Sequence, residues 1–207
     1  MKPIPLLLTL LALSALALFL MAPIPQPEAY HAYADQRVLF GIPFFWNVVS
    51  NLPMLFIGAY GLWQCRRHWL ERPAGAARWI PAVLSGGIFI TCFGSAYYHW
   101  APSNGTLLWD RLPMTLMFMS LFSLLVYDFL GKQAGSVSFW WSVPLGMASV
   151  LYWHFTEAAG QGDLRPYALV QFFPMLAAPV LLLAYPGKVP YVRYILLLLG
   201  WYAVAKV

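Results

Sequence analysis

Long hydrophobic runs, separated by short stretches rich in charge, proline or glycine, make up most of the chain. A membrane-spanning helix needs about 20 mostly apolar residues. Seven runs approach this length: residues 4–22, 44–65, 79–99, 106–129, 137–155, 166–185 and 190–207. They are continuously apolar, whereas the strands of a membrane β-barrel alternate between apolar and polar positions. The pattern therefore predicts an all-α protein, a polytopic transmembrane bundle of seven hydrophobic helices.

The composition agrees with an integral membrane protein. Hydrophobic residues make up 61% of the 207 residues, charged residues make up 9%, and the mean hydropathy is +0.68. This leaves too little polar surface to cover a soluble globule. The net charge of +5 would suggest nucleic acid binding in a soluble protein. Here the basic residues are spread over the loops, so we expect no nucleic acid partner, and no protein partner is indicated.

The charges in the loops predict how the helices cross the membrane. Three loops lean positive and hold Arg66, Arg67, Arg72 and Arg78 in the first, Lys132 in the second and Lys188 in the third. Basic loops stay in the cytoplasm. The alternate segments are less basic and hold Glu28 and Asp35, then Ser103 and Asn104, then Glu157 and Asp163. We expect these three to face outward.

Residues 1–25 contain the first hydrophobic run and the start of a proline-rich tail. This segment can be read as a retained anchor helix or as a signal peptide. We favour the anchor, because the run is long for a signal peptide and the nearest small-x-small cleavage candidate, at 32–34, lies too far downstream. Short connections follow, so residues 40–207 are expected to form one transmembrane domain.

One group of polar residues lies beside some of the most apolar sequence in the chain. Ser95 and His99 stand four residues apart, so a helix places both on one face. Pro102 and Asn104–Gly105 then indicate a tight turn. Asp110 lies about one turn into the next helix, and an antiparallel hairpin returns it to the level of His99. Because charge is expensive at membrane depth, this convergence points to a metal site or a proton-transfer site.

Plainer interpretations of these residues remain open. A serine in a membrane helix often bonds its own backbone, a histidine near a helix end is often interfacial, and Asp110 can pair with Arg111 or cap a helix. Histidine and carboxylate are ordinary zinc ligands, but zinc needs a third protein ligand. Among His31, His68 and His154, only His154 is placed to reach His99 and Asp110 as a third ligand. Its surroundings, however, look more like an aromatic belt at the membrane interface.

A second polar cluster occurs at the start of the second run. Asn47, Ser50 and Asn51 share one helix face by their spacing. Interhelical hydrogen bonding and direct substrate contact both explain such a cluster, and we weigh the former slightly higher.

Three stretches together resemble the alkaline ceramidase family, within the wider superfamily of seven-helix membrane hydrolases. They are FWNVVSN at 45–51, GSAYYHWAP at 94–102 and WDRLPM at 109–114. The resemblance implies a zinc-dependent intramembrane hydrolase that cleaves the N-acyl amide bond of ceramide-like lipids. It implies Ser95, His99 and Asp110 as catalytic residues, with zinc held by His99 and Asp110 and with Ser95 stabilising the transition state. The region YALVQFFP is closest to bacterial members, which suggests a bacterial inner membrane with the site toward the periplasm.

The chain departs from the family pattern in two places. The family carries two further histidine ligands four residues apart on its last helix, and this sequence has no such pair. We therefore expect one extra N-terminal helix plus six of the seven family core helices, a C-terminally truncated chain with an incomplete zinc site. Eukaryotic relatives bind calcium through acidic residues where Phe44 and Phe45 stand here, so calcium is not expected.

Other functions are compatible with the same pattern. The chain could be a non-enzymatic seven-helix receptor or a lipid-binding membrane protein. It could be an inactive fragment that lacks the histidine pair, or a small transporter that uses His99 and Asp110 as a proton relay. Zinc content and fatty-acid release from N-acyl lipids distinguish these possibilities.

Overall fold

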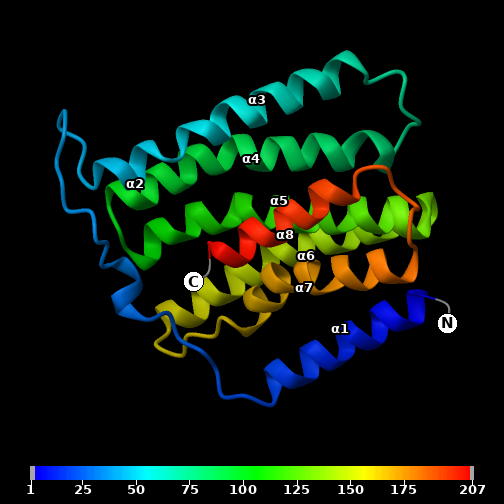
Figure 1. Cartoon of the computed structure of the whole chain (residues 1–207). Helices are drawn as coiled ribbons and strands as arrows, with labels where there is room; N and C mark the ends of the chain where they lie inside the picture. The colour runs from blue at the N-terminus through cyan, green and yellow to red at the C-terminus, as the bar shows by residue number, and fades with distance from the viewer. Residues whose placement is uncertain (1–2, 206–207) are drawn as a thin grey trace.

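The computed structural model describes residues 3–205 and consists of helices joined by short loops (Figure 1). The elements are α1 (Pro3–Phe19), the 3-10 helix η1 (Glu28–His31), α2 (Phe45–Val49), α3 (Leu52–Arg67), α4 (Ala76–Trp100), α5 (Asn104–Leu130), α6 (Lys132–Ala158), α7 (Arg165–Ala184) and α8 (Val192–Val204). Apart from the short η1 and α2, this gives the predicted seven helices and confirms the all-α class. The last two residues of the predicted run 190–207 lie outside the described residues.

The second predicted helix is broken into two pieces. The run 44–65 forms α2 and α3, which are separated at Ser50 and Asn51. Pro53 stands in the first turn of α3. The N–H groups of the first turn have no carbonyl partner within the helix, so a proline there costs no hydrogen bond. Farther inside a continuous helix the same residue would remove a hydrogen bond and clash with the preceding turn. Pro53 therefore stands at a helix start that accommodates it.

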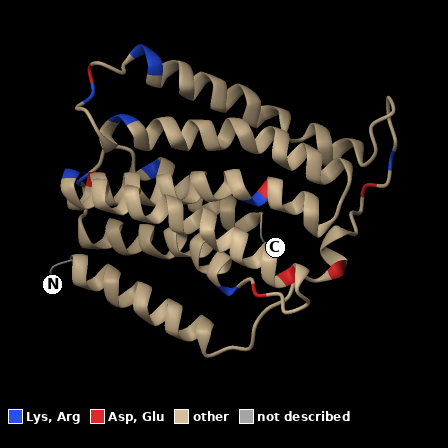
Figure 2. Ribbon diagram, turned by 180° about the vertical axis from the view of Figure 1, so that it is seen from behind, with Lys and Arg blue, Asp and Glu red and all other residues tan. Residues whose placement is uncertain are grey.

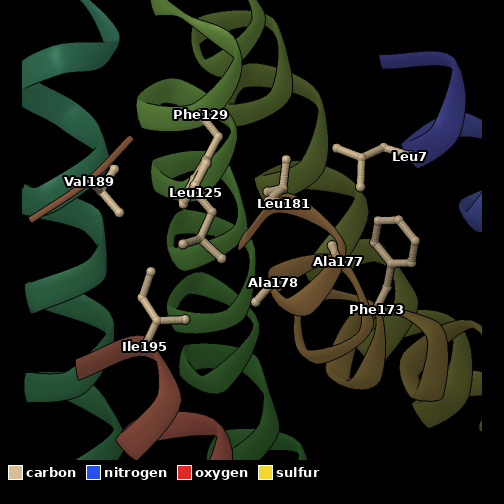
Figure 3. Packing of buried hydrophobic residues seen from close by; sticks show 9 residues of the cluster. All are labelled: Leu7, Leu125, Phe129, Phe173, Ala177, Ala178, Leu181, Val189 and Ile195. Atoms are coloured by element: carbon tan, nitrogen blue, oxygen red, sulfur yellow. The ribbon is translucent and has the colours of Figure 1, made fainter. Parts of the chain in front are cut away.

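Helix α5 lies at the centre of the bundle. It packs against α4, α6 and α7, while α3 covers the far side of α4 and α1 packs against α7 (Figure 1). Buried residues occur along the whole length of α5, from Thr106 to Phe129. The largest hydrophobic cluster joins α5 to three other helices and to the loop before α8 (Figure 3). Its members are Leu7, Leu125, Phe129, Phe173, Ala177, Ala178, Leu181, Val189 and Ile195.

Three helices, α4, α5 and α7, are long and apolar enough to cross a membrane by length and composition. Shorter apolar helices are found at Ile4–Phe19 and Val192–Val204. The chain is therefore an integral membrane protein. Figure 2 shows most of the Lys and Arg at one end of the bundle. We call this the basic end, which holds the α3–α4, α5–α6 and α7–α8 connections, and we call the opposite end, where α4 ends and α5 begins, the site end.

Helices α4 and α5 approach each other closely at Gly94. A β-carbon added there would lie against the backbone carbonyl of Trp109, well inside van der Waals contact. Small residues let membrane helices pack backbone to backbone, which replaces the hydrophobic driving force that is missing inside lipid. Gly94 therefore sets the spacing of the hairpin that carries Ser95, His99 and Asp110.

We expect Gly94→Ala to destabilise the protein by about 1–3 kcal/mol, the usual cost of overpacking a tight contact. The matched control is Gly86→Ala on the same helix, where the nearest atom to an added β-carbon is Leu62 Cδ2 at 3.9 Å. Thermal unfolding in detergent measures both variants. Equal midpoints for the two would show that the α4–α5 spacing does not depend on Gly94.

Candidate functional site

The hairpin between α4 and α5 is fixed by a hydrogen-bonded turn. Ser103 caps α5, because its side chain accepts a hydrogen bond from the backbone N–H of Thr106 at 3.1 Å. The Thr106 hydroxyl donates in turn to the carbonyl of Ala101 at 2.7 Å. This short connection makes α4 and α5 antiparallel neighbours, as the sequence predicted.

Within the hairpin, Ser95 and Asp110 lie together in the protein interior. Their residues are 6% and 8% exposed, and the Ser95 side chain interacts with the Asp110 carboxylate. His99 is half-buried near the end of α4. The ring nitrogen Nδ1 of His99 and the oxygen Oδ1 of Asp110 are both buried without a hydrogen-bond partner in the described structure.

Unpartnered buried polar atoms are rare in native structures, and each costs about 1–3 kcal/mol. The two such atoms of His99 and Asp110 are a nitrogen and a carboxylate oxygen, the types that bind zinc. They therefore fit a metal as part of a ligand set. Among residues 3–205, no group of three His, Cys, Asp or Glu side chains is placed to hold a metal ion.

The segment between α1 and α2 covers this site, and we call residues 20–44 the cover segment. The ring of Tyr33 lies 4.9 Å from the ring of His99, centroid to centroid, and Tyr33 also interacts electrostatically with Asp110. Its hydroxyl is buried near that of Tyr98, without a well-formed hydrogen bond. Burial is the main cause that raises the pKa of Tyr33, so this phenol stays protonated. Tyr33 thus packs on His99 and acts electrostatically on Asp110.

The histidine beside the site is His31, which the sequence did not indicate. Its two ring nitrogens are bonded to the Tyr98 hydroxyl at 2.9 Å and to the Asn104 side-chain oxygen at 3.0 Å. His154 was the one other histidine that the sequence placed within reach, although its surroundings favoured an aromatic belt, and its ring lies beside those of Trp153 and Phe155. It belongs to no ligand group among the described residues.

Asp110 does not pair with its neighbour Arg111. The three ion pairs among the described residues exclude both side chains. The Arg111 guanidinium instead lies 4.2 Å from the ring centre of Trp153 and 4.9 Å from that of Tyr167, and its Nη2 donates to Gln26 Oε1 at 2.6 Å. Its Nη1 has no hydrogen-bond partner in the described structure. Aromatic faces attract a desolvated cation by about 2 kcal/mol or more, so the cage replaces the missing carboxylate.

Further contacts hold the cover segment on the bundle. Glu157 Oε2 accepts hydrogen bonds from the Gln26 backbone N–H at 3.0 Å and from the Trp153 indole at 3.1 Å. Arg165 donates to the carbonyl of Met21 at 2.7 Å and forms an ion pair with the buried Asp163 at 2.8 Å. That guanidinium holds the pKa of the Asp163 carboxyl below its usual range.

The second polar cluster makes local hydrogen bonds. Ser50 donates to the carbonyl of Asn47 at 2.9 Å, and the buried Asn51 side chain donates to the carbonyls of Asn47 at 2.9 Å and Val48 at 3.2 Å. These bonds satisfy backbone groups that the break between α2 and α3 leaves free. Contact of Asn47, Ser50 and Asn51 with a substrate stays a prediction.

The fold and the site define a polytopic helical membrane protein with a buried polar site at one end. A comparison with protein families matches the Ceramidase family model over residues 40–182. The chain therefore belongs to the Ceramidase family, as its motifs indicated. The matched region includes Ser95, His99 and Asp110 but leaves out α1, His31 and Tyr33. No curated protein and no solved structure matches the chain.

We expect Arg111→Met to lower the free energy of unfolding by about 2–4 kcal/mol, because it removes the cation from its cage and leaves Gln26 Oε1 unpaired. Arg66→Met is the matched control, since Arg66 is exposed at the basic end. Thermal unfolding in detergent measures both. A similar small change in both variants would contradict a stabilising role of the cage.

The Asp163–Arg165 pair should make stability depend on pH. A carboxyl whose pKa is lower in the folded protein stabilises it above the pKa of the unfolded chain, about 3.9, and this contribution is lost as pH falls through the folded pKa. We therefore expect Asp163→Asn to lower the melting temperature at pH 7, and the difference from the wild type to shrink below about pH 4. Glu28→Gln is the matched control, because it removes the same charge at an exposed position of the cover segment. An unchanged melting temperature in Asp163→Asn at pH 7 would exclude this role.

Proposed function

We propose that this protein is a zinc-dependent hydrolase that cleaves the N-acyl amide bond of ceramide-like lipids inside the membrane. Family membership implies an amide hydrolase with a lipid substrate. The observation that carries the proposal is the pair of buried, unpartnered atoms His99 Nδ1 and Asp110 Oδ1, with Ser95 on the same Asp110 carboxylate, inside the region that matches the family.

His99 and Asp110 are the residues that would hold the zinc ion. Among residues 3–205, no third His, Cys, Asp or Glu side chain lies with them to complete the ligand set. Zinc, when bound in such a site, lowers the pKa of a water ligand toward 7 and polarises a carbonyl group. The burial of Asp110 suits this role, since a low-dielectric site strengthens the attraction between a carboxylate and a cation.

The remaining chemistry falls to residues of this chain. The Ser95 hydroxyl, now directed at Asp110, is placed to donate a hydrogen bond to the oxyanion that forms when the amide carbonyl is attacked. Such donors contribute about 2.7–4 kcal/mol in other enzymes. The ring of Tyr33 covers His99 and excludes bulk water from it. Withdrawal of this ring would admit the lipid amide.

The charge distribution favours one orientation in the membrane. The basic end would face the cytoplasm by the positive-inside rule, which puts the site end on the opposite face. In a bacterial inner membrane this is the periplasmic face. Ceramide-like lipids of the outer leaflet would then meet the site near their amide group, close to the membrane surface.

The proposal predicts separate effects on zinc content and on hydrolysis. His99→Ala and Asp110→Asn should abolish fatty-acid release from N-acyl sphingoid lipids and lower the zinc content of the purified protein. Ser95→Ala should keep zinc and lose about 100-fold to 1,000-fold in rate, because it removes only the oxyanion donor. His68→Ala is the control, since His68 pairs with Glu71 at the exposed basic end.

Zinc measurement and fatty-acid release are scored on the same preparations. If His99→Ala and Asp110→Asn hold as much zinc as the wild type, these two residues do not bind the metal. Lipid binding without fatty-acid release, in a preparation that holds zinc, would favour the alternative of a non-enzymatic lipid-binding protein.

A further inference from the structure

A long groove opens toward the lipid between α1 and the pair α5–α6. Its volume is about 830 Å³, within the range of about 300–1,000 Å³ typical of ligand sites. It exists because α1 packs against α7 and leaves α6 uncovered. Leu8 on α1 and Val137 and Trp141 on α6 line it with large exposed side chains.

The groove lies apart from the candidate active site. On α5 its lining begins at Phe122 and continues toward the basic end, whereas Asp110 lies toward the site end. The rise of about 1.5 Å per residue puts these two positions about 18 Å apart along the helix. The wall formed by α1 also lies outside the residues that match the family.

Inside a bilayer an apolar groove of this size does not remain empty, because lost packing contacts cost free energy. Water is a poor occupant, since it needs two to four polar partners. Along α6 the groove runs from Lys132 to Leu145, about 20 Å at the helical rise. One leaflet of a bilayer has a hydrocarbon depth of about 15 Å, half of about 30 Å. The groove is therefore long enough for a lipid acyl chain that starts at the membrane surface.

The charged end of the groove selects the headgroup. Lys132 and Gln133 line it at the basic end, and both are exposed. The nearest acidic side chain on α5, Asp128, is bonded to the Tyr191 hydroxyl and does not line the groove. An ammonium group at the end of an apolar groove is complementary to a lipid phosphate.

We propose that the groove is a binding site for one anionic phospholipid, with an acyl chain between α1 and α6 and the headgroup phosphate on Lys132. The lipid fills the space that α1 leaves uncovered, so it holds α1 to the bundle from the side opposite to α7. The proposal does not depend on hydrolysis, because no residue of the groove belongs to the proposed active site.

Native mass spectrometry of the protein purified in mild detergent tests this site, with phosphatidylglycerol and phosphatidylcholine of the same acyl chains as probes. We expect one phosphatidylglycerol to bind more tightly than phosphatidylcholine. Lys132→Ala should weaken the binding of phosphatidylglycerol about fivefold, the effect of one basic contact near a membrane surface. It should weaken the binding of phosphatidylcholine less, because the choline cation offsets the phosphate charge of that lipid. Lys188→Ala, the same change on the exposed α7–α8 loop, should leave both unchanged.

A second variant tests the acyl chain separately from the headgroup. Ala134 lines the groove, and Ala134→Phe narrows it, so both lipids should bind more weakly to this variant while the melting temperature without added lipid stays near that of the wild type. Equal affinity of the wild type for the two lipids, or unchanged phosphatidylglycerol binding in Lys132→Ala, would overturn the headgroup assignment. Unchanged binding in Ala134→Phe would overturn the groove as the site, and a dimer that Ala134→Phe dissociates would identify a second copy of the chain as the occupant.

Discussion

The buried guanidinium of Arg111 is the constraint around which the site end is built. A cation at this depth has lost its water, and no carboxylate among residues 3–205 forms an ion pair with it. Its compensation comes from the faces of Trp153 and Tyr167 and from the side-chain oxygen of Gln26. These partners belong to α6, α7 and the cover segment, so satisfying one charge draws three parts of the chain onto α5. The position of the cover segment follows, and with it the contact of Tyr33 with His99.

The helices could be predicted from the sequence because membrane insertion depends on a simple property, the length of an apolar run. The hairpin at Ser95, His99 and Asp110 could be predicted as well, because Pro102 and the Asn-Gly pair that follows permit little except a tight turn. Local chemistry decided both features. The break between α2 and α3 has a visible signal in Pro53, which stands in the first turn of α3.

The contacts of the cover segment had no comparable signal. Residues 20–44 lack a helical or strand period, and their positions depend on partners far along the chain. His31 meets Asn104, and Gln26 meets Arg111, through single hydrogen bonds between side chains. A periodicity argument detects a repeated face, not a single distant contact. An unpaired arginine inside a hydrophobic run was the one available clue, since such a residue must find partners outside its own helix.

The separation of Arg111 from Asp110 bears on the chemistry of the site. If the two adjacent side chains formed an ion pair, the carboxylate would be satisfied and a metal would have to displace a guanidinium to reach it. The aromatic cage holds the cation apart, and Asp110 Oδ1 is left without a partner. The positive charge remains close enough to Asp110 to act on it electrostatically without occupying Oδ1. The arrangement therefore keeps a cation near Asp110 while leaving Oδ1 free for a metal, a combination that a direct ion pair could not provide.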